Sequence, residues 1–276
     1  DYDKKKYEVI IKNGYNPSEN RNYGIKKAKG EIIAFIDDDA VVHKDLLKNS
    51  EDFFNKYNVD IVGGPQLTPK DDGFFAKLSG AAIESWFGTY KMSNRYKRGK
   101  LNLDADEFSL TSANCFVKKN VFNKIKGFDP RLWPGEDPEF FSRVKKAGFK
   151  IAYSPDLIIY HRRRPDLFSF FKQFYKYGNK RLKKEKIDKT IVNLVMLIPS
   201  IFTIYIIFLP LLSIFSNLFL FPIKLYFLIA LIFSFFISLK KNILYLIFLP
   251  IIFFLIHFSY GLGMIVSLFE NEKSKS

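Results

Sequence analysis

Short apolar runs alternate with polar stretches over the first 165 residues of the chain, whereas a nearly continuous apolar region begins at residue 191. The short runs predict β-strands at residues 7–11, 32–36, 60–62, 114–117, 150–153 and 157–160. Helical spacing and capping signals predict a helix that follows Ser18, a short helix at 121–125 and a longer one at 139–147. Strands that alternate with helices are typical of an α/β domain.

The last third of the chain has the pattern of a membrane region. Between residues 191 and 239 the only charged side chain is Lys224, and about 20 apolar residues suffice to cross a bilayer. This length predicts two spans with a turn near 216–224, and residues 243–269 predict a third. We therefore expect an α/β domain at 1–165, an amphipathic interfacial segment at 166–190, three transmembrane helices at 191–269 and a polar tail at 270–276.

The charge pattern supports this organisation. The formal net charge is +15, and positive residues gather at 172–189, before the first span, and at 240–241, between the second and third. Positive loops face the cytoplasm, so we expect an integral protein of the cell membrane whose first domain is cytoplasmic. The lysines lie beside the spans and no nucleic-acid motif is present, so membrane lipid, and no nucleic acid, is the expected partner. The single cysteine, Cys115, fits a reducing compartment and excludes an internal disulfide.

Three consecutive carboxylates, Asp37, Asp38 and Asp39, follow the strand predicted at 32–36. Such a group can be a solvated strand end. Three adjacent carboxylates repel one another, however, and a divalent cation with oxygen ligands relieves that repulsion, so we favour a Mg²⁺ or Mn²⁺ site. His161 also follows an apolar run, and it could add a nitrogen ligand or be a structural histidine.

A second acidic pair, Glu136 and Asp137, precedes the helix predicted at 139–147. Asp137 before a proline suits a helix N-cap, and the pair equally suits a general base that accepts a proton from a hydroxyl. The sequence leaves these two interpretations open. The adjacent glycines Gly63 and Gly64 indicate either a tight turn or a close approach of another group to the backbone.

Taken together, these residues resemble the membrane-anchored family 2 glycosyltransferases, which have the GT-A fold. The resemblance extends over residues 7–181 and rests on an ordered set of motifs rather than on any single one. The matching pieces are Arg21-Asn22-x-Gly24, 28–31, 36–40, 62–64, 127–129, 135–140 with Arg143, Ala147-Gly148, Pro155 and His161. The resemblance implies a Rossmann-like GT-A domain of the α/β class, followed by an α-helical transmembrane region.

The resemblance also implies roles for individual residues. Asp37 and Asp39 fill the family's DxD positions, which bind a divalent ion and the ribose of a nucleotide-sugar donor, and His161 lies where members add a metal or diphosphate contact. Asp137 matches the catalytic base of an inverting displacement, with Glu136 as the alternative base. The implied donor-binding residues are Arg21, Asn22, Gly24, Asp37 and Asp38. The candidates for acceptor or loop contacts are Gly63, Gly64, Trp133 and Gln173.

Two departures from the family pattern are visible. Processive polysaccharide synthases carry a Gln-x-x-Arg-Trp signature after the catalytic domain, whereas Gln173 is followed here by Lys176 and Tyr177 at the last two positions. This difference argues against processive polymerisation. The family's first two strands are not recognisable before Tyr7, so we expect the sequence to begin part-way through the nucleotide-binding half.

The leading hypothesis is a metal-dependent, inverting glycosyltransferase that moves a sugar from a nucleotide-sugar donor to a lipid-linked or cell-envelope glycan acceptor at the cytoplasmic membrane face. One alternative is a haloacid-dehalogenase-like phosphatase with its nucleophile among Asp37 and Asp39. It leaves Glu136, Asp137 and His161 without a role. The other alternative is a non-enzymatic membrane scaffold whose basic face binds anionic lipid.

Overall fold

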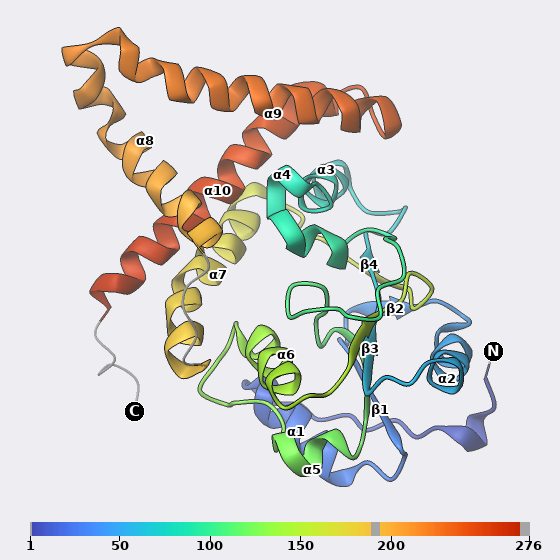
Figure 1. Ribbon diagram of the computed structural model, residues 1–276. Helices are drawn as coiled ribbons and strands as arrows, with labels where there is room; N and C mark the ends of the chain where they lie inside the picture. Colours follow the sequence, from blue (N-terminus) through green and yellow to red (C-terminus); the bar gives the residue numbers. More distant parts are fainter. Residues whose placement is uncertain (1, 189–193, 271–276) are drawn as a thin grey trace. The chain divides into compact units, whose positions relative to one another are not determined.

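The computed structural model describes residues 2–188 and 194–270. The chain divides into two compact units, one formed by Asp1–Asp72 with Lys91–Arg162 and the other by Gly73–Tyr90 with Arg163–Ser276. We call them the sheet unit and the helical unit (Figure 1). Residues 73–90, which the sequence pattern places inside an α/β domain at 1–165, group with the helical unit instead.

The sheet unit is built on a four-stranded sheet with the order β1-β5-β3-β6. The strands are β1 (Ile32–Ile36), β3 (Ile61–Gly63), β5 (Asn114–Lys118) and β6 (Ile151–Tyr153). β5 is antiparallel to β1 and β3, and β3 is parallel to β6, so β1, β3 and β6 all run in one direction. Ile36 at the end of β1 lies opposite Asn114 at the start of β5, and this register places the start of β5 beside the acidic turn after β1.

A smaller sheet with the order β2-β7-β4 brings distant parts of the chain to the same place. Its strands are β2 (Ala40–Val42), β4 (Gln66–Leu67) and β7 (Ile159–His161). β2 and β7 are antiparallel with Ala40 opposite His161. Because Ala40 directly follows the three aspartates, this pairing carries His161 to the same turn.

Helices cover both faces of the larger sheet. They are α1 (Pro17–Lys27), α2 (Leu46–Lys56), α5 (Val121–Ile125) and α6 (Glu136–Lys146), whereas the short η1 (Lys4–Lys6) buries no residue. Neighbouring strand residues point to opposite faces. Val117 accordingly belongs to the buried cluster that contains Phe140 of α6, whereas Phe116 belongs to the cluster that contains Leu46 and Phe53 of α2. Apolar residues on both faces of β5 therefore fix this sheet between two helical layers.

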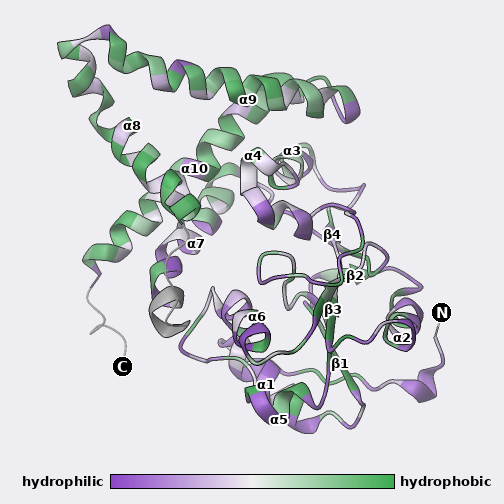
Figure 2. Ribbon diagram, in the orientation of Figure 1, coloured by the Kyte–Doolittle hydropathy of each residue, from purple (hydrophilic) through white to green (hydrophobic). Residues whose placement is uncertain are grey.

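Among its described residues, the helical unit contains three helical segments long and apolar enough to cross a membrane, Leu194–Phe215, Asn217–Lys240 and Tyr245–Phe269. Its elements are α3 (Phe74–Ile83), α4 (Trp86–Thr89), α7 (Leu167–Asp188), η3 (Leu194–Leu197), α8 (Ile198–Phe215), η4 (Asn217–Leu220), α9 (Phe221–Lys240) and α10 (Tyr245–Phe269), with η2 (Tyr90–Arg95) at its boundary. Figure 2 shows the apolar character of α8, α9 and α10 along most of their length. The expected three long apolar helices are confirmed, while residues 189–193 and most of the tail expected at 270–276 lie outside the described residues.

Glycines allow α10 to approach its neighbours closely. A Cβ atom on Gly178 of α7 would lie 1.9 Å from the carbonyl oxygen of Tyr260, and one on Gly261 of α10 would lie 2.1 Å from that of Pro199. These positions accept no larger side chain, and small residues at helix contacts are typical of membrane helix packing.

The chain passes between the two units after residues 72, 90 and 162. Within the sheet unit, Arg162 donates hydrogen bonds to Asp72 (2.9 Å) and Asp71 (2.7 Å). Asp72 is buried, and its hydrogen bond with Arg162 holds the crossing after residue 72 close to the crossing after residue 162.

Two local predictions are wrong, and one of the two interpretations left open for Asp137 is excluded. Residues 7–11 form no strand, and Val9 and Ile11 are exposed, because a strand needs a hydrogen-bonded neighbour and no described segment pairs with this one. The first helix is capped by Asn16, which accepts from the backbone N–H groups of Ser18 and Glu19, and not by Ser18 itself. Asp137 does not cap α6, because the N-cap is Gly135 and Asp137 lies inside the first turn.

Candidate active site

Two carboxylates and an imidazole converge at the turn between β1 and β2. Nε2 of His161 lies 3.1 Å from Oδ1 of Asp39 and 3.7 Å from Oδ2 of Asp37. One possible ligand atom from each of the three residues lies within 4.8 Å of the others. Hard carboxylate oxygens with one nitrogen suit Mn²⁺ or Mg²⁺, so the residues present fit the divalent ion expected from the sequence.

The ionised form of Asp37 is stabilised by its neighbours. Burial disfavours the charged carboxylate, but the hydrogen bond and charge of His161 and the guanidinium of Arg21 outweigh this penalty and lower the pKa of Asp37. A metal ligand must be deprotonated, so this environment prepares Asp37 for a cation. Asp38, by contrast, is exposed at the same turn.

The second acidic pair projects from the first turn of α6. Gly135 is the N-cap of the helix and has a φ of 122°, a conformation that favours glycine. The chain turns at this residue, so Glu136 and Asp137 are the first two residues of α6. The side chain of Glu136 is 8 % exposed, whereas that of Asp137 is 18 % exposed. Asp137 is thus the more accessible of the two carboxylates.

Ser112 holds the carboxylate of Asp137. Its backbone N–H donates to Oδ2 of Asp137 at 3.0 Å, and its hydroxyl donates a short hydrogen bond to Oδ1. The neighbouring Thr111 accepts hydrogen bonds from the side chain of Gln66 and from the backbone N–H of Ala113, which shapes the loop that presents Ser112. Sequence reasoning missed Ser112. The signal was a run of small polar residues just before β5, a pattern too common to single out one of them.

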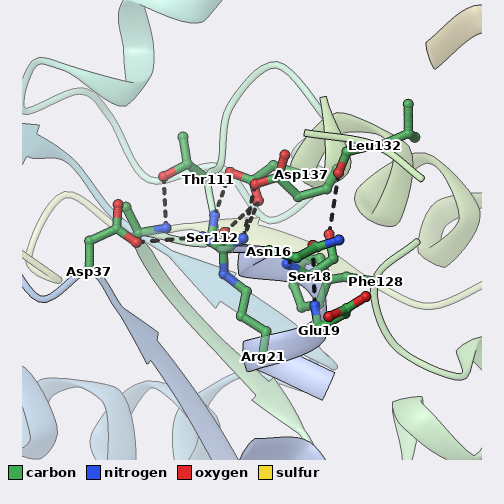
Figure 3. A network of polar contacts seen from close by, with 12 residues as sticks. Asn16, Ser18, Glu19, Arg21, Asp37, Thr111, Ser112, Phe128, Leu132 and Asp137 are labelled. Atoms are coloured by element: carbon green, nitrogen blue, oxygen red, sulfur yellow. Dashed lines mark hydrogen bonds and ion pairs between the residues drawn. The ribbon is translucent and has the colours of Figure 1, made fainter. Parts of the chain in front are cut away.

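Arg21 joins the two acidic groups (Figure 3). Its guanidinium lies 2.9 Å from Oε1 of Glu136, 4.0 Å from Oδ1 of Asp137 and 3.5 Å from Oδ1 of Asp37. The guanidinium also lies over the ring of Phe128, 5.4 Å from the ring centre. One cation therefore stands between Asp37, which follows β1, and the two carboxylates of α6, which limits their mutual repulsion.

Glu136 titrates near neutral pH. Burial and the charge of Asp137 raise the pKa of Glu136 from 4.5 to about 7, against the opposing effect of Arg21. A carboxyl group with a pKa near the working pH can exchange a proton readily. This carboxyl group is, however, already engaged by Arg21 and nearly buried.

The other expected donor-binding residues of α1 lie close to Arg21 in sequence but differ in their surroundings. Both polar side-chain atoms of Asn22 are hydrogen-bonded to the backbone of Phe128, each at 2.8 Å. Asn22 therefore fixes the turn before α6 to α1. Gly24 has no atom within 4 Å of the place a Cβ would occupy, so the space beside it is open.

The acceptor and loop candidates are dispersed. A Cβ on Gly63 would lie 2.8 Å from the carbonyl oxygen of Asn114, and one on Gly64 would lie 2.0 Å from that of Leu157, so the groups that approach these glycines belong to the protein itself. Trp133 is 54 % exposed in the loop before α6. Gln173 belongs to the helical unit, where it donates a hydrogen bond to the hydroxyl of Tyr177 at 2.9 Å.

The mixed α/β fold with its acidic cluster at the end of β1 is that of a GT-A-like glycosyltransferase domain. The family model described as "Glycosyltransferase like family 2" matches residues 6–176, and the chain belongs to this family. The predicted family and fold class are confirmed. The match favours the glycosyltransferase hypothesis over the phosphatase and scaffold alternatives.

Three curated proteins illustrate the relatives. The chain is 25% identical over 169 residues to the glycosyltransferase AglE of Haloferax volcanii, covering 61% of this chain and 51% of that protein. It is 25% identical over 172 residues to the O-antigen chain rhamnosyltransferase WbaN of Salmonella anatum, covering 62% and 53%. It is 27% identical over 151 residues to the minor teichoic acid biosynthesis protein GgaB of Bacillus subtilis, covering 53% and 15%. The chain thus spans about half the length of AglE and WbaN.

Among solved structures, the chain is similar to TarS of S. aureus. A crystal structure of TarS in complex with UDP-GlcNAc matches with 16% sequence identity and a TM-score of 0.40, covering 64% of this chain and 52% of that chain. A complex of TarS with UDP matches with 13% identity and a TM-score of 0.39, covering 91% and 71%.

Proposed function

We propose that the protein is a metal-dependent, inverting glycosyltransferase that transfers a sugar from a nucleotide-sugar donor to a cell-envelope glycan or lipid-linked acceptor at the cytoplasmic face of the membrane. The observation that carries the proposal is the position of Arg21, which contacts Asp37 of the cation-binding cluster and both carboxylates at the start of α6. A cation-binding group and a candidate base are thereby held within one polar network. Family membership supports the same reaction class.

On the donor side, we propose that Asp37, Asp39 and His161 hold the divalent ion. Bound there, Mg²⁺ or Mn²⁺ would neutralise the diphosphate of the donor as a Lewis acid. Asp38 is exposed beside this cluster, and the space next to Gly24 is open, which leaves both positions available to the nucleotide. Arg21 orients Asp37, and Asn22 supports the turn that precedes α6.

On the acceptor side, we propose Asp137 as the general base. Its carboxylate accepts the proton of the acceptor hydroxyl while the hydroxyl oxygen forms a bond to the anomeric carbon. The bond between that carbon and the diphosphate breaks at the same time, the electron pair leaves with the nucleoside diphosphate, and attack from the opposite side inverts the configuration. Asp137 is favoured over Glu136 because it is more accessible and is held by Ser112, whereas Glu136 is engaged by Arg21.

The relatives and the helices support the proposed acceptor and location. WbaN and GgaB are named for O-antigen chain and teichoic acid synthesis, which are cell-envelope products. Three apolar helices follow the sheet unit, and membrane attachment would keep the enzyme near a lipid-linked acceptor. Lys240, the last residue of α9, and Lys241, which follows it, favour a cytoplasmic position for the turn before α10 and for the sheet unit.

The test is a panel of nucleotide sugars with the full chain in native membranes, with Mn²⁺ or Mg²⁺, scored by released nucleoside diphosphate. We expect cation-dependent release from one donor. Asp39→Ala and Asp137→Asn should each reduce this release by at least about 100-fold, the scale of losing one electrostatic or general-base group. Binding of Mn²⁺ alone, measured by calorimetry, should be lost in Asp39→Ala and retained in Asp137→Asn.

The matched control is Asp52→Asn, which neutralises an exposed carboxylate on α2. It should leave both donor turnover and Mn²⁺ binding unchanged. Turnover that survives chelation of divalent ions would contradict metal dependence, and retention of the anomeric configuration in the product would contradict direct displacement by Asp137.

A further inference from the structure

Residues 73–90 are an insertion that leaves the sheet unit after β4 and returns at the start of η2, yet they group with the helical unit. α3 carries one charged residue, Lys77, and is otherwise small or apolar. Seven of its ten residues are buried, so α3 is packed against protein over most of its surface. The proposed glycosyl transfer assigns no role to this insertion.

The insertion packs along about three turns of α10, roughly 18 Å of helix. At the start of α10, the ring of Phe74 packs edge-on against Tyr245 and Phe248, with ring centres 5.9 and 5.8 Å apart. Further along, the ring of Phe87 packs edge-on against Phe253 at 5.1 Å and against His257 at 5.2 Å. The insertion thus follows α10 well beyond its first turn.

The insertion also contacts α9. The ring of Phe87 stacks on that of Phe233 with centres 5.1 Å apart. At the end of α9, Lys241 forms an ion pair with Glu84. The insertion thus contacts α9 and α10, and both of these helices are candidate membrane spans.

The break between α3 and α4 has its backbone groups satisfied from within the protein. The hydroxyl of Thr89 donates to the carbonyl of Ile83 at 2.6 Å, and Ser85 accepts from the N–H of Phe87 at 3.2 Å. Nε2 of His257 lies 2.9 Å from the carbonyl oxygen of Phe87, which can only accept, so Nε2 carries the proton. Irregular backbone at membrane depth requires internal partners of this kind, because lipid offers none.

The outer side of the insertion is apolar and exposed. Phe74 is 45% exposed and Trp86 is 57% exposed. Phe248, which contacts Phe74, is itself 41% exposed on α10. The exposed apolar surface of α10 therefore continues onto the insertion without a polar boundary at this contact.

From this continuity we propose that residues 74–89 are a second membrane-contacting element, in which Phe74 and Trp86 face the lipid and His257 satisfies the broken backbone. The partner is the bilayer, with acyl chains against the two aromatic side chains. The inference rests on the membrane location proposed for α8, α9 and α10, but not on glycosyl transfer.

The chain has only two tryptophans, Trp86 and Trp133, which makes the inference directly measurable. In a Trp133→Phe variant of the full chain, Trp86 is the only indole. The protein is placed in nanodiscs of anionic phospholipid with either brominated or unbrominated acyl chains, and tryptophan emission is compared. We expect Trp86 to lose about half of its emission in brominated lipid, and to respond weakly to iodide added in the aqueous phase.

A second variant separates this inference from the membrane location itself. Trp86→Phe with Trp133→Phe and Phe235→Trp places the single indole on α9, where Phe235 is exposed. Quenching at position 235 without quenching of Trp86 would overturn the inference and leave the membrane location standing. Failure of bromine to quench either indole would overturn both, whereas quenching at both positions supports the inference.

Discussion

Ser112 holds Asp137 with two hydrogen bonds, one from its backbone N–H to Oδ2 at 3.0 Å and one from its hydroxyl to Oδ1. The two donors come from one residue and reach both carboxylate oxygens, so the plane of the carboxylate is fixed. A base must present its oxygen along the line of the hydroxyl proton, and orientation of this kind is a large part of catalytic efficiency. Ser112 is therefore a positioning residue for the proposed base.

Removal of the Ser112 hydroxyl tests this role. Ser112→Ala keeps the backbone donor and removes one hydrogen bond to a charged group, which typically contributes about 1.5–3 kcal/mol, so we expect kcat to fall about 10- to 100-fold. The KM for the donor should stay within about twofold, since the cation cluster is untouched. Ser112→Thr, which retains a hydroxyl, should recover most of the loss. Equal turnover in Ser112→Ala and the unsubstituted protein would contradict the positioning role.

Glu136 should make the stability of the sheet unit depend on pH. Its pKa is raised from 4.5 to about 7 by burial and by Asp137, so the folded state binds a proton more tightly than the unfolded state does. This contribution is fully present below pH 4.5 and is lost as the pH rises through about 7.

The measurement is thermal unfolding at a series of pH values for the unsubstituted protein and for Glu136→Gln, which is uncharged at every pH. The unfolding temperature of the unsubstituted protein should fall relative to that of the variant between pH 5 and pH 7. A difference between the two proteins that stays constant over this range would show that Glu136 does not have a raised pKa in the folded state.

His257 offers a stability test in the helical unit. Nδ1 of His257 lies 2.8 Å from the hydroxyl of Tyr226, which donates to it, while Nε2 donates to the carbonyl of Phe87. His257→Leu would leave that carbonyl unpaired, and an unsatisfied buried acceptor costs about 1–3 kcal/mol. His257→Gln retains an N–H donor and should be destabilised less.

The two variants are compared by thermal unfolding in detergent. His257→Leu should unfold at a clearly lower temperature than His257→Gln, and Tyr226→Phe should lie between the latter and the unsubstituted protein. If His257→Leu were as stable as His257→Gln, the hydrogen bond to Phe87 would not hold the insertion in place.

The proposed membrane orientation can be tested with two single cysteines. Ser216, in the turn before α9, should face the outside, and Asn242, before α10, should face the cytoplasm. The native Cys115 is buried and should not react. In intact cells, an impermeant maleimide should label Ser216→Cys and leave Asn242→Cys unlabelled until the cells are opened. The reverse pattern would overturn the cytoplasmic placement of the sheet unit.

The sequence was sufficient for those parts of the fold that depend on local pattern. The apolar run before Asp37 is β1, the helix at 121–125 is α5 with the same limits, and the long apolar region forms three helices. Each of these elements is encoded by residues close together in the chain. The strand predicted at 7–11 failed because pairing depends on a neighbour elsewhere in the chain, which the local pattern does not reveal.

The sequence named the acidic members of the candidate site but not the contacts that join them. The ordered motifs pointed to Asp37, Asp39, Asp137 and His161, and the pairing of β2 with β7 brings His161 to the aspartates. The bridge from Arg21 to Glu136 joins residues 115 positions apart, and Ser112 reaches Asp137 across 25 positions. Such contacts arise only when the sheet is assembled, so a single sequence gives no spacing rule for them.

The chain crosses from one unit to the other after residues 72, 90 and 162. This connectivity limits how the enzyme can be cut into stable fragments. A fragment that ends at Arg162 would still contain α3 and α4 but would lack α9 and α10, which cover them, and the uncovered apolar surface would favour aggregation. The three long apolar helices therefore cannot simply be cut away from the rest of the chain. A soluble fragment would require a polar linker in place of residues 73–90, and recombination between related genes would have to exchange both segments of the helical unit together.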